Sequence, residues 1–252
     1  HMLTVNGLVI RERASGENDK ILSILSDTEG LVEVCAKGVK KANAKNASVS
    51  QCFCYAKYCV TEGRNYYILN SAEPIRMFYD IRLDIEKFAL ASYFCELLLY
   101  TCPKGEANYE VLRLILNTLH FLSKGTRTNE MLKSVFEMRL MSEIGLVPNL
   151  IGCCECYRYL APYMQFDLAS GKLYCEVCCP LTDLRNCEQI NMPVLHALRL
   201  IALSDMAEIF KFKISKLYQP QLSRVTERYV LIQLGRNFKT LDFYKSLINK
   251  KD

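Results

Sequence analysis

Residues 151–179 read IGCCECYRYLAPYMQFDLASGKLYCEVCC and contain two C-x-x-C pairs. The first pair is Cys153 and Cys156, the second is Cys175 and Cys178, and eighteen residues separate the pairs. Each pair can turn two thiolates toward one point, and a tetrahedral Zn²⁺ takes four such ligands. The spacing therefore predicts one zinc site held by these four cysteines.

Two neighbouring cysteines leave the ligand register open. Cys154 could replace Cys153 by forming a tighter C-x-C pair, and Cys179 follows the second pair directly. Free thiols or disulfides are the alternative to a metal site. Four cysteines close the coordination shell, whereas a catalytic zinc usually keeps one open position. We therefore expect a structural zinc that folds a short knuckle over residues 148–180.

Composition and length restrict the class of protein. The chain has 252 residues, half of them hydrophobic, and a net charge of +5, as expected of a globular protein with one large or two small domains. Its thirteen cysteines are an odd number in a long chain with no signal-peptide pattern, which argues against a secreted disulfide scaffold. No apolar run reaches the roughly 18 residues of a membrane span. We expect a cytoplasmic protein with no membrane partner.

The first seventy residues are predicted to be β structure, because short apolar segments alternate with turn signals at close spacing. Five short antiparallel strands fit a small closed barrel of the OB type, and an SH3-like barrel is the alternative. A polar, basic loop over Lys37–Ser50 interrupts the series. The predicted strands are Thr4–Arg11, Lys20–Ser26, Leu31–Ala36, Gln51–Thr61 and Asn65–Ser71.

From Pro74 onward the apolar residues recur at helical spacing. Thr128 is a plausible helix N-cap, and Gly145 is a plausible helix C-cap. Pro193 is a plausible first residue of a later helix. The fold class is therefore α+β, with an OB-fold domain over residues 1–78 and an α-helical domain over 79–252 that carries the zinc knuckle as an insertion. The predicted helices are Ile81–Tyr100, Ala107–Ser123, Thr128–Glu143, Pro193–Lys211 with a break near Ser204, and Ser223–Phe238.

Positive charge is concentrated in two stretches. Val34–Thr61 holds five lysines and no carboxylate, and Ile209–Asp252 holds ten Lys/Arg against three Asp/Glu. Such stretches attract an anionic polymer, although a solvated surface is the ordinary alternative. An OB barrel binds nucleic acid through a basic groove and aromatic platforms. The predicted DNA contacts are Lys37, Lys40, Lys41 and Lys45 of one loop, flanked by Arg11, Arg13 and Arg64.

Alternation along the predicted strand Gln51–Thr61 places Phe53, Tyr55 and Lys57 on one face. That face is either a platform for stacked bases or part of the barrel core. Core is the preferred interpretation, because small barrels need bulky residues inside.

Several segments, taken in order, resemble the RecO family of bacterial recombination mediators. Gly16–Ile21 is similar to the family's G-E-x-D-[KR]-I turn, and Ala36–Lys41 to its A-K-G-x-[KR]-[KR] segment. Ala91–Leu98 is similar to the first helix of the family's α domain. Glu137–Pro148 leads into the cysteines in the family's order, and Phe166 and Gly171 precede Cys175 as expected.

The resemblance implies an N-terminal OB domain, an α-helical domain and a zinc knuckle. It also implies a nucleoid-associated protein of the RecFOR pathway that binds single- and double-stranded DNA, anneals complementary strands and helps to load RecA onto strands coated by SSB. The implied partners are RecR and the acidic, aromatic-tipped C-terminal tail of SSB. The extra cysteines depart from the family pattern; they are Cys52, Cys54, Cys59, Cys154 and Cys179.

The SSB tail would need an apolar pocket rimmed by cations. Arg127, Lys133 and Arg139 are the candidates for these cations, although an ordinary amphipathic helix is the preferred interpretation. No P-loop, G-x-S-x-G or H-E-x-x-H motif occurs, so we expect no enzymatic activity. A zinc-stabilised RNA-binding protein and a protein-interaction adaptor are the alternative functions.

Overall fold

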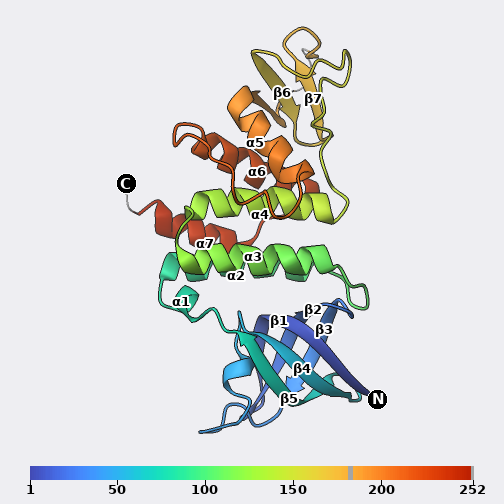
Figure 1. The fold of residues 1–252 in the computed structure, drawn as a ribbon, viewed down its shortest axis with the longest axis vertical. Helices are drawn as coiled ribbons and strands as arrows, with labels where there is room; N and C mark the ends of the chain where they lie inside the picture. The colour runs from blue at the N-terminus through green and yellow to red at the C-terminus, as the bar shows by residue number, and fades with distance from the viewer. Residues whose placement is uncertain (181–183, 251–252) are drawn as a thin grey trace. The chain divides into compact units, whose positions relative to one another are not determined.

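The N-terminal strands close into a barrel in the order β1-β2-β3-β5-β4 (Figure 1). This computed structural model describes residues 1–180 and 184–250. The β3–β5 pair is parallel and the other pairs are antiparallel, as in an OB fold, so the predicted OB-type barrel is confirmed. The strands are β1 (Met2–Ser15), β2 (Asp19–Ser26), β3 (Leu31–Ala36), β4 (Tyr55–Glu62) and β5 (Tyr67–Arg76).

The prediction for the fourth strand is wrong in its phase. β4 begins at Tyr55, and the side chains that fill the barrel are those of Ala56, Tyr58 and Val60, each fully buried. Tyr55 and Lys57 therefore point outward. Phe53 lies before the strand at a φ of 70° and packs edge-on against Phe88, at 5.9 Å between ring centroids. Of the three residues, only Phe53 is buried as the core interpretation expected.

Four helices pack with the barrel in the first of two compact units, which comprises residues 1–124 and the residues from Phe238 onward. The last helix, α7, was not predicted; it packs against α2, and Phe238 just before it contacts the rings of Tyr93 and Tyr100. No helix in the described part of the chain is long and apolar enough to cross a membrane. The helices are α1 (Tyr79–Arg82), α2 (Ile85–Thr101), α3 (Tyr109–Lys124) and α7 (Lys239–Ile248).

The second unit, Gly125–Asn237, contains three helices that pack through α4. Thr128 caps α4 as predicted, since its hydroxyl accepts from the Met131 N–H at 3.1 Å, and Gly145 follows the helix with a φ of +87°. Pro193 lies in the first turn of α5, which ends at the predicted break. These helices are α4 (Asn129–Glu143), α5 (Met192–Leu203) and α6 (Gln219–Leu234).

The cysteine segment forms a small antiparallel sheet in the second unit, in the order β7-β6-β8. Its strands are β6 (Tyr163–Asp167), β7 (Lys172–Cys175) and β8 (Cys187–Asn191). Phe166 is fully buried, and its ring meets that of Tyr229 on α6 at 5.7 Å. The sheet thus connects the cysteines to the helices.

The boundaries between the compact units lie after Lys124 and after Asn237, whereas the expected domain boundary lay at residue 78. That boundary follows the change from strands to helices, whereas the contacts group α1–α3 and α7 with the barrel. Residues 125–237 form a continuous insertion between the two chain segments of the first unit.

Candidate metal centre and nucleic-acid interface

The four cysteines of the two C-x-x-C pairs come together at one point. Their sulfur atoms, from Cys153, Cys156, Cys175 and Cys178, all lie within 4.8 Å of one another. The Cys156 and Cys175 sulfurs are 3.7 Å apart. Tetrahedral zinc with Zn–S bonds of about 2.3 Å places its sulfurs about 3.8 Å apart, so these residues fit such an ion. Cys154 is outside this group, with its sulfur 3.9 Å from the Glu155 carboxylate.

Backbone geometry turns the first pair toward the second. The Cys153 carbonyl accepts from the Tyr157 N–H at 2.9 Å, and Tyr157 adopts a φ of 63° to reverse the chain. A side chain at Gly152 would meet the Tyr157 and Arg158 carbonyls at 2.9 and 3.0 Å, so glycine is required there. In the second pair, the Cys175 carbonyl accepts from the Cys178 N–H at 3.2 Å. Both pairs therefore form tight turns.

The pKa values of two thiols in this group move in opposite directions. Burial opposes ionisation of Cys153, but backbone N–H groups of Cys156, Cys175 and Glu155 outweigh it and lower the Cys153 pKa to about 6. Hydrogen bonds to the Cys175 and Cys156 sulfurs raise the Cys178 pKa to about 12. Cysteines bind a metal ion as thiolates, so metal binding at such a site releases the protons of the thiols.

Two arginines fix the knuckle in place. Arg158 pairs with Glu176 at 2.6 Å and so joins the two cysteine turns. Arg199 of α5 is buried and donates to the Leu150 and Tyr159 carbonyls at 2.7 and 2.9 Å. Its guanidinium also lies 3.8 Å from the centroid of the Tyr159 ring. The first cysteine turn is therefore held to a helix by a buried cation.

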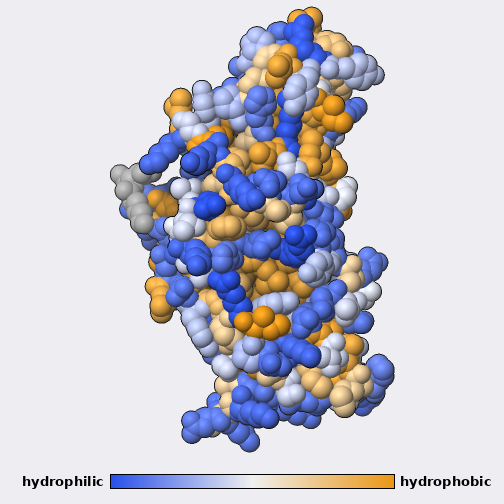
Figure 2. All heavy atoms as spheres, in the orientation of Figure 1, coloured by the Kyte–Doolittle hydropathy of each residue, from blue (hydrophilic) through white to orange (hydrophobic). Residues whose placement is uncertain are grey.

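The four predicted DNA-contacting lysines lie in one loop between β3 and β4. All four are exposed, and within the described residues none has an ion-pair partner. Figure 2 shows this loop as a hydrophilic projection at the lower end of the barrel. Four unpaired cations on one loop repel each other and attract phosphate. They are Lys37, Lys40, Lys41 and Lys45.

The loop is tied to the β1–β2 turn at its start. The Asp19 carboxylate accepts from the Gly38 N–H at 2.7 Å, and the Lys40 N–H donates to the Asn18 carbonyl at 3.0 Å. Gly38 has a φ of +68°, which favours glycine. The first half of the loop is therefore held both by hydrogen bonds and by the buried side chain of Val39.

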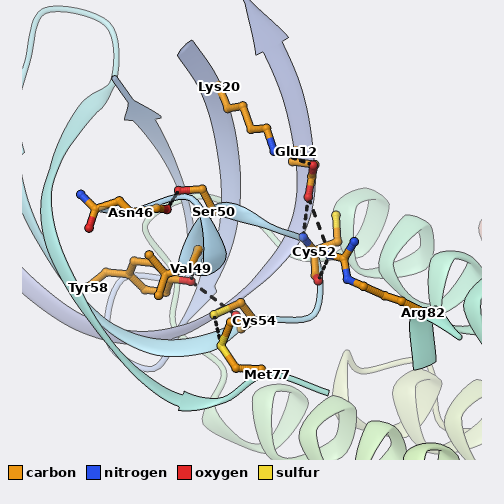
Figure 3. Close-up of polar contacts among 10 residues, drawn as sticks. All are labelled: Glu12, Lys20, Asn46, Val49, Ser50, Cys52, Cys54, Tyr58, Met77 and Arg82. Atoms are coloured by element: carbon orange, nitrogen blue, oxygen red, sulfur yellow. Dashed lines mark hydrogen bonds and ion pairs between the residues drawn. The ribbon is translucent and has the colours of Figure 1, made fainter. Parts of the chain in front are cut away.

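A short 3₁₀ helix, η1 (Ser48–Ser50), anchors the end of the loop in the barrel (Figure 3). Val49 is buried in the core, and its carbonyl accepts from the Tyr58 hydroxyl at 2.8 Å. The Glu12 carboxylate then accepts from the Cys52 N–H at 2.6 Å, and Arg82 donates to the Cys52 carbonyl at 2.5 Å. Both ends of the lysine loop are thus fixed.

The predicted arginines occupy a neighbouring part of the barrel. Arg11 and Arg13 of β1 both pair with Glu33 of β3, at 3.4 and 3.5 Å. Arg13 also lies over the Tyr66 ring, 5.8 Å from its centroid. Arg64 is exposed in the β4–β5 hairpin, two residues before Tyr66. Since Glu33 already neutralises part of this charge, the lysine loop holds the freer cations.

Comparison with known proteins decides the family. The family description "Recombination protein O N terminal" matches residues 2–78, and "Recombination protein O C terminal" matches residues 82–242. The chain belongs to the RecO family. The DNA repair protein RecO of Acetivibrio thermocellus is 31% identical over 245 residues, which cover 97% of each chain. That of Alkaliphilus metalliredigens is 28% identical over 247 residues, covering 98% of this chain and all of the relative.

The contacts give physical meaning to two motifs by which the sequence resembles the RecO family. Asp19 belongs to the G-E-x-D-[KR]-I turn and Gly38 to the A-K-G-x-[KR]-[KR] segment. The hydrogen bond between them joins the two motifs across the barrel end. Membership of this family places the chain among proteins of recombinational DNA repair.

Two of the three cations expected to receive an SSB tail, Lys133 and Arg139, are buried and are therefore not available to rim an open pocket. Lys133 is buried between Glu137 and Glu227, at 3.0 and 3.1 Å. Arg139 is buried and donates to the Ile201 and Ser204 carbonyls. Arg127 donates to the Phe210 carbonyl at 2.8 Å. These three side chains hold α4 to the rest of its unit.

Proposed function

We propose that this RecO-family protein is a recombination mediator that binds single- and double-stranded DNA and anneals complementary strands. With RecR, it would help to load RecA onto DNA coated by SSB. The observation that carries the proposal is the lysine loop, which holds four free cations on an anchored backbone. Binding energy, without nucleotide hydrolysis, would drive annealing on this surface.

An anchored loop suits phosphate binding better than a free one. Each phosphate contact releases condensed counterions, which supplies most of the affinity of a cationic surface for DNA. Ordering a flexible loop on binding would consume part of that gain, whereas a loop already fixed at Gly38 and Val49 avoids the cost. Contacts to phosphate carry no base information, so binding through this loop should not depend on sequence.

Replacing Lys37, Lys40 and Lys41 by alanine should weaken strand binding and flatten its salt dependence. The slope of log K against log salt is about −0.7 per phosphate contact for single strands, so three lost contacts reduce it by roughly 2 units. Titrations at several salt concentrations measure the slope. Circular dichroism should show an intact fold, because exposed lysines contribute little to stability.

The matched control is a variant with Arg11 and Arg13 replaced by alanine. Glu33 already pairs with both arginines, so this variant should change the slope less than the lysine variant does. An unchanged slope in the folded lysine variant would mean that the loop is only a solvated surface.

Annealing of SSB-coated complementary strands tests the mediator role directly. The protein should accelerate annealing, and the lysine variant should not. Preferential binding of RNA over DNA would favour the alternative of an RNA-binding protein, and no nucleic-acid binding would favour an adaptor.

We also propose that the metal of the cysteine group is a single structural Zn²⁺. Four sulfurs at the spacing of a tetrahedral shell, with no other ligand type among them, support this identity. When bound, the ion would cross-link the two cysteine turns.

A different surface meets the requirements of an SSB tail. A groove of about 420 Å³ lies between α5 and the segment that precedes α6, with Leu200, Phe212 and Tyr218 in its apolar wall and Lys213 on its lining. Lys213 and nearby Lys216 are exposed. We propose that this groove receives the terminal aromatic residue of the tail.

Replacing both Lys213 and Lys216 by alanine should weaken binding of a labelled SSB-tail peptide and reduce its salt dependence. Removal of the peptide's terminal aromatic residue should cost on the order of 1–3 kcal/mol, because that residue would fill an apolar site. Fluorescence anisotropy measures both effects. Equal binding of the full and the shortened peptide would reject the groove.

A further inference from the structure

A groove of about 340 Å³ lies beside the β4–β5 hairpin of the first unit. The hairpin residues Glu62–Tyr67 form one wall, Leu31–Glu33 of β3 a second, and Lys104 with Gly105 a third. β3 joins β5 through the pairs Val34–Tyr67 and Cys35–Ile68. The groove lies where the two strands diverge before those pairs.

The hairpin brings two tyrosine rings to this groove, and Tyr66 is the one that contacts Arg13. Tyr66 lines the groove, and the Arg13 guanidinium lies 5.8 Å from its ring centroid. Arg13 also contacts the Tyr66 hydroxyl at 3.5 Å. Tyr67 also lines the groove, but its side chain packs against the barrel core. Tyr66 is therefore the tyrosine of the pair whose ring is not engaged in the core.

The charged residues that line the groove are of both signs. Arg64 and Lys104 are exposed cations, and Arg13 adjoins them through Tyr66. Glu29, Glu33 and Glu62 also line the groove. A phosphate is therefore attracted by some of the lining residues and repelled by others. A nucleobase is uncharged, offers an aromatic face and carries N–H donors that carboxylates accept.

We propose that Tyr66 stacks an unpaired nucleobase in this groove and so gives the chain a preference for single-stranded DNA. The inference rests on the proposed DNA binding and adds a residue that recognises bases to a surface that otherwise binds phosphates. Bases within a duplex are stacked on their neighbours, so they cannot enter the groove. The lysine loop, in contrast, would bind both forms of DNA.

The test compares a labelled single-stranded oligonucleotide of mixed sequence with its duplex. Tyr66→Ala should weaken single-strand binding about 5- to 100-fold, the loss expected for one stacked base. Duplex binding and the salt slope should stay unchanged, because no phosphate contact is lost. Tyr66→Phe keeps the ring and should bind like the wild type. Tyr79→Ala, which removes another exposed tyrosine of the same unit, is the control.

The outcomes separate this inference from the proposed function. Wild-type protein that binds no DNA would overturn both. Single-strand binding that is unchanged in folded Tyr66→Ala, or an equal loss for strand and duplex, would overturn the stacking role and leave the lysine loop in place. Tyr66→Leu, which keeps apolar bulk but no aromatic face, repeats the test in case the alanine variant does not fold. Quenching of a 2-aminopurine base in the strand by wild-type protein, but not by Tyr66→Leu, is the supporting signal.

Discussion

Replacement of Cys175 by serine should abolish tight metal binding and destabilise the knuckle. Cys175 is fully buried, and its sulfur is 3.7 Å from that of Cys156, so no other thiol can take its place without moving the strand β7. Closed zinc sites contribute about 10–16 kcal/mol to the folding of zinc-finger peptides, so we expect a loss of several kcal/mol here. Elemental analysis should find one zinc per chain in the wild type and almost none in the variant.

The loss of stability should be local. Phe166 and Leu173 form a buried apolar layer under the sheet, and Phe166 packs on Tyr229 of α6, so the strands keep part of their support. Hydrogen exchange should rise first around residues 151–160 and 175–179. Cys154→Ser is the matched control and should retain metal, because its sulfur lies outside the group. Metal-free wild-type protein of normal stability would contradict the prediction, and metal loss in Cys154→Ser alone would show a different register.

Replacement of Lys133 by methionine should destabilise the second unit by about 3–5 kcal/mol. The change leaves the fully buried Glu137 carboxylate with a hydroxyl partner, Thr226, but without its cation at 3.0 Å. Burial lowers the Lys133 pKa, but Glu137 and Glu227 outweigh that effect and raise it, so the ammonium is the stable form. Urea unfolding measures the free-energy difference.

Two further variants make this prediction specific. Lys216→Ala removes an exposed lysine of the same unit and should change stability by less than about 0.5 kcal/mol. Lys133→Met combined with Glu137→Gln should recover part of the loss, because the buried charge that lost its cation is gone. If the double variant is as unstable as the sum of the two single variants, the two residues are not energetically coupled.

The sequence predicted the features that depend on local spacing. The C-x-x-C pairs, the Thr128 cap and the close series of barrel strands each follow from residues that are near one another in the chain. The phase of β4 was not predictable in this way. Side chains alternate between two faces along a strand, but Phe53 has a φ of 70° and lies before β4 begins. The position of Phe53 therefore does not indicate which face of β4 fills the barrel.

The roles of the charged residues on α4 depend on distant partners. Glu137 lies four residues after Lys133 and is visible in the sequence, but Glu227 comes from another helix. The two carboxylates are what make burial of the lysine possible, so the sequence pattern alone suggested an exposed rim. The same applies to Tyr66, because its link to Arg13 joins residues 53 positions apart.

The insertion of residues 125–237 into the first unit has a consequence for synthesis on the ribosome. α2 contacts α7, and the rings of Tyr93 and Tyr100 contact Phe238 just before that helix. The barrel emerges first and the inserted unit second, but α7 emerges after both. Until α7 is synthesised, the nascent barrel with α1–α3 therefore exposes the apolar face that α7 later covers. The inserted unit, in contrast, can fold before α7 emerges, because all of its segments have been synthesised.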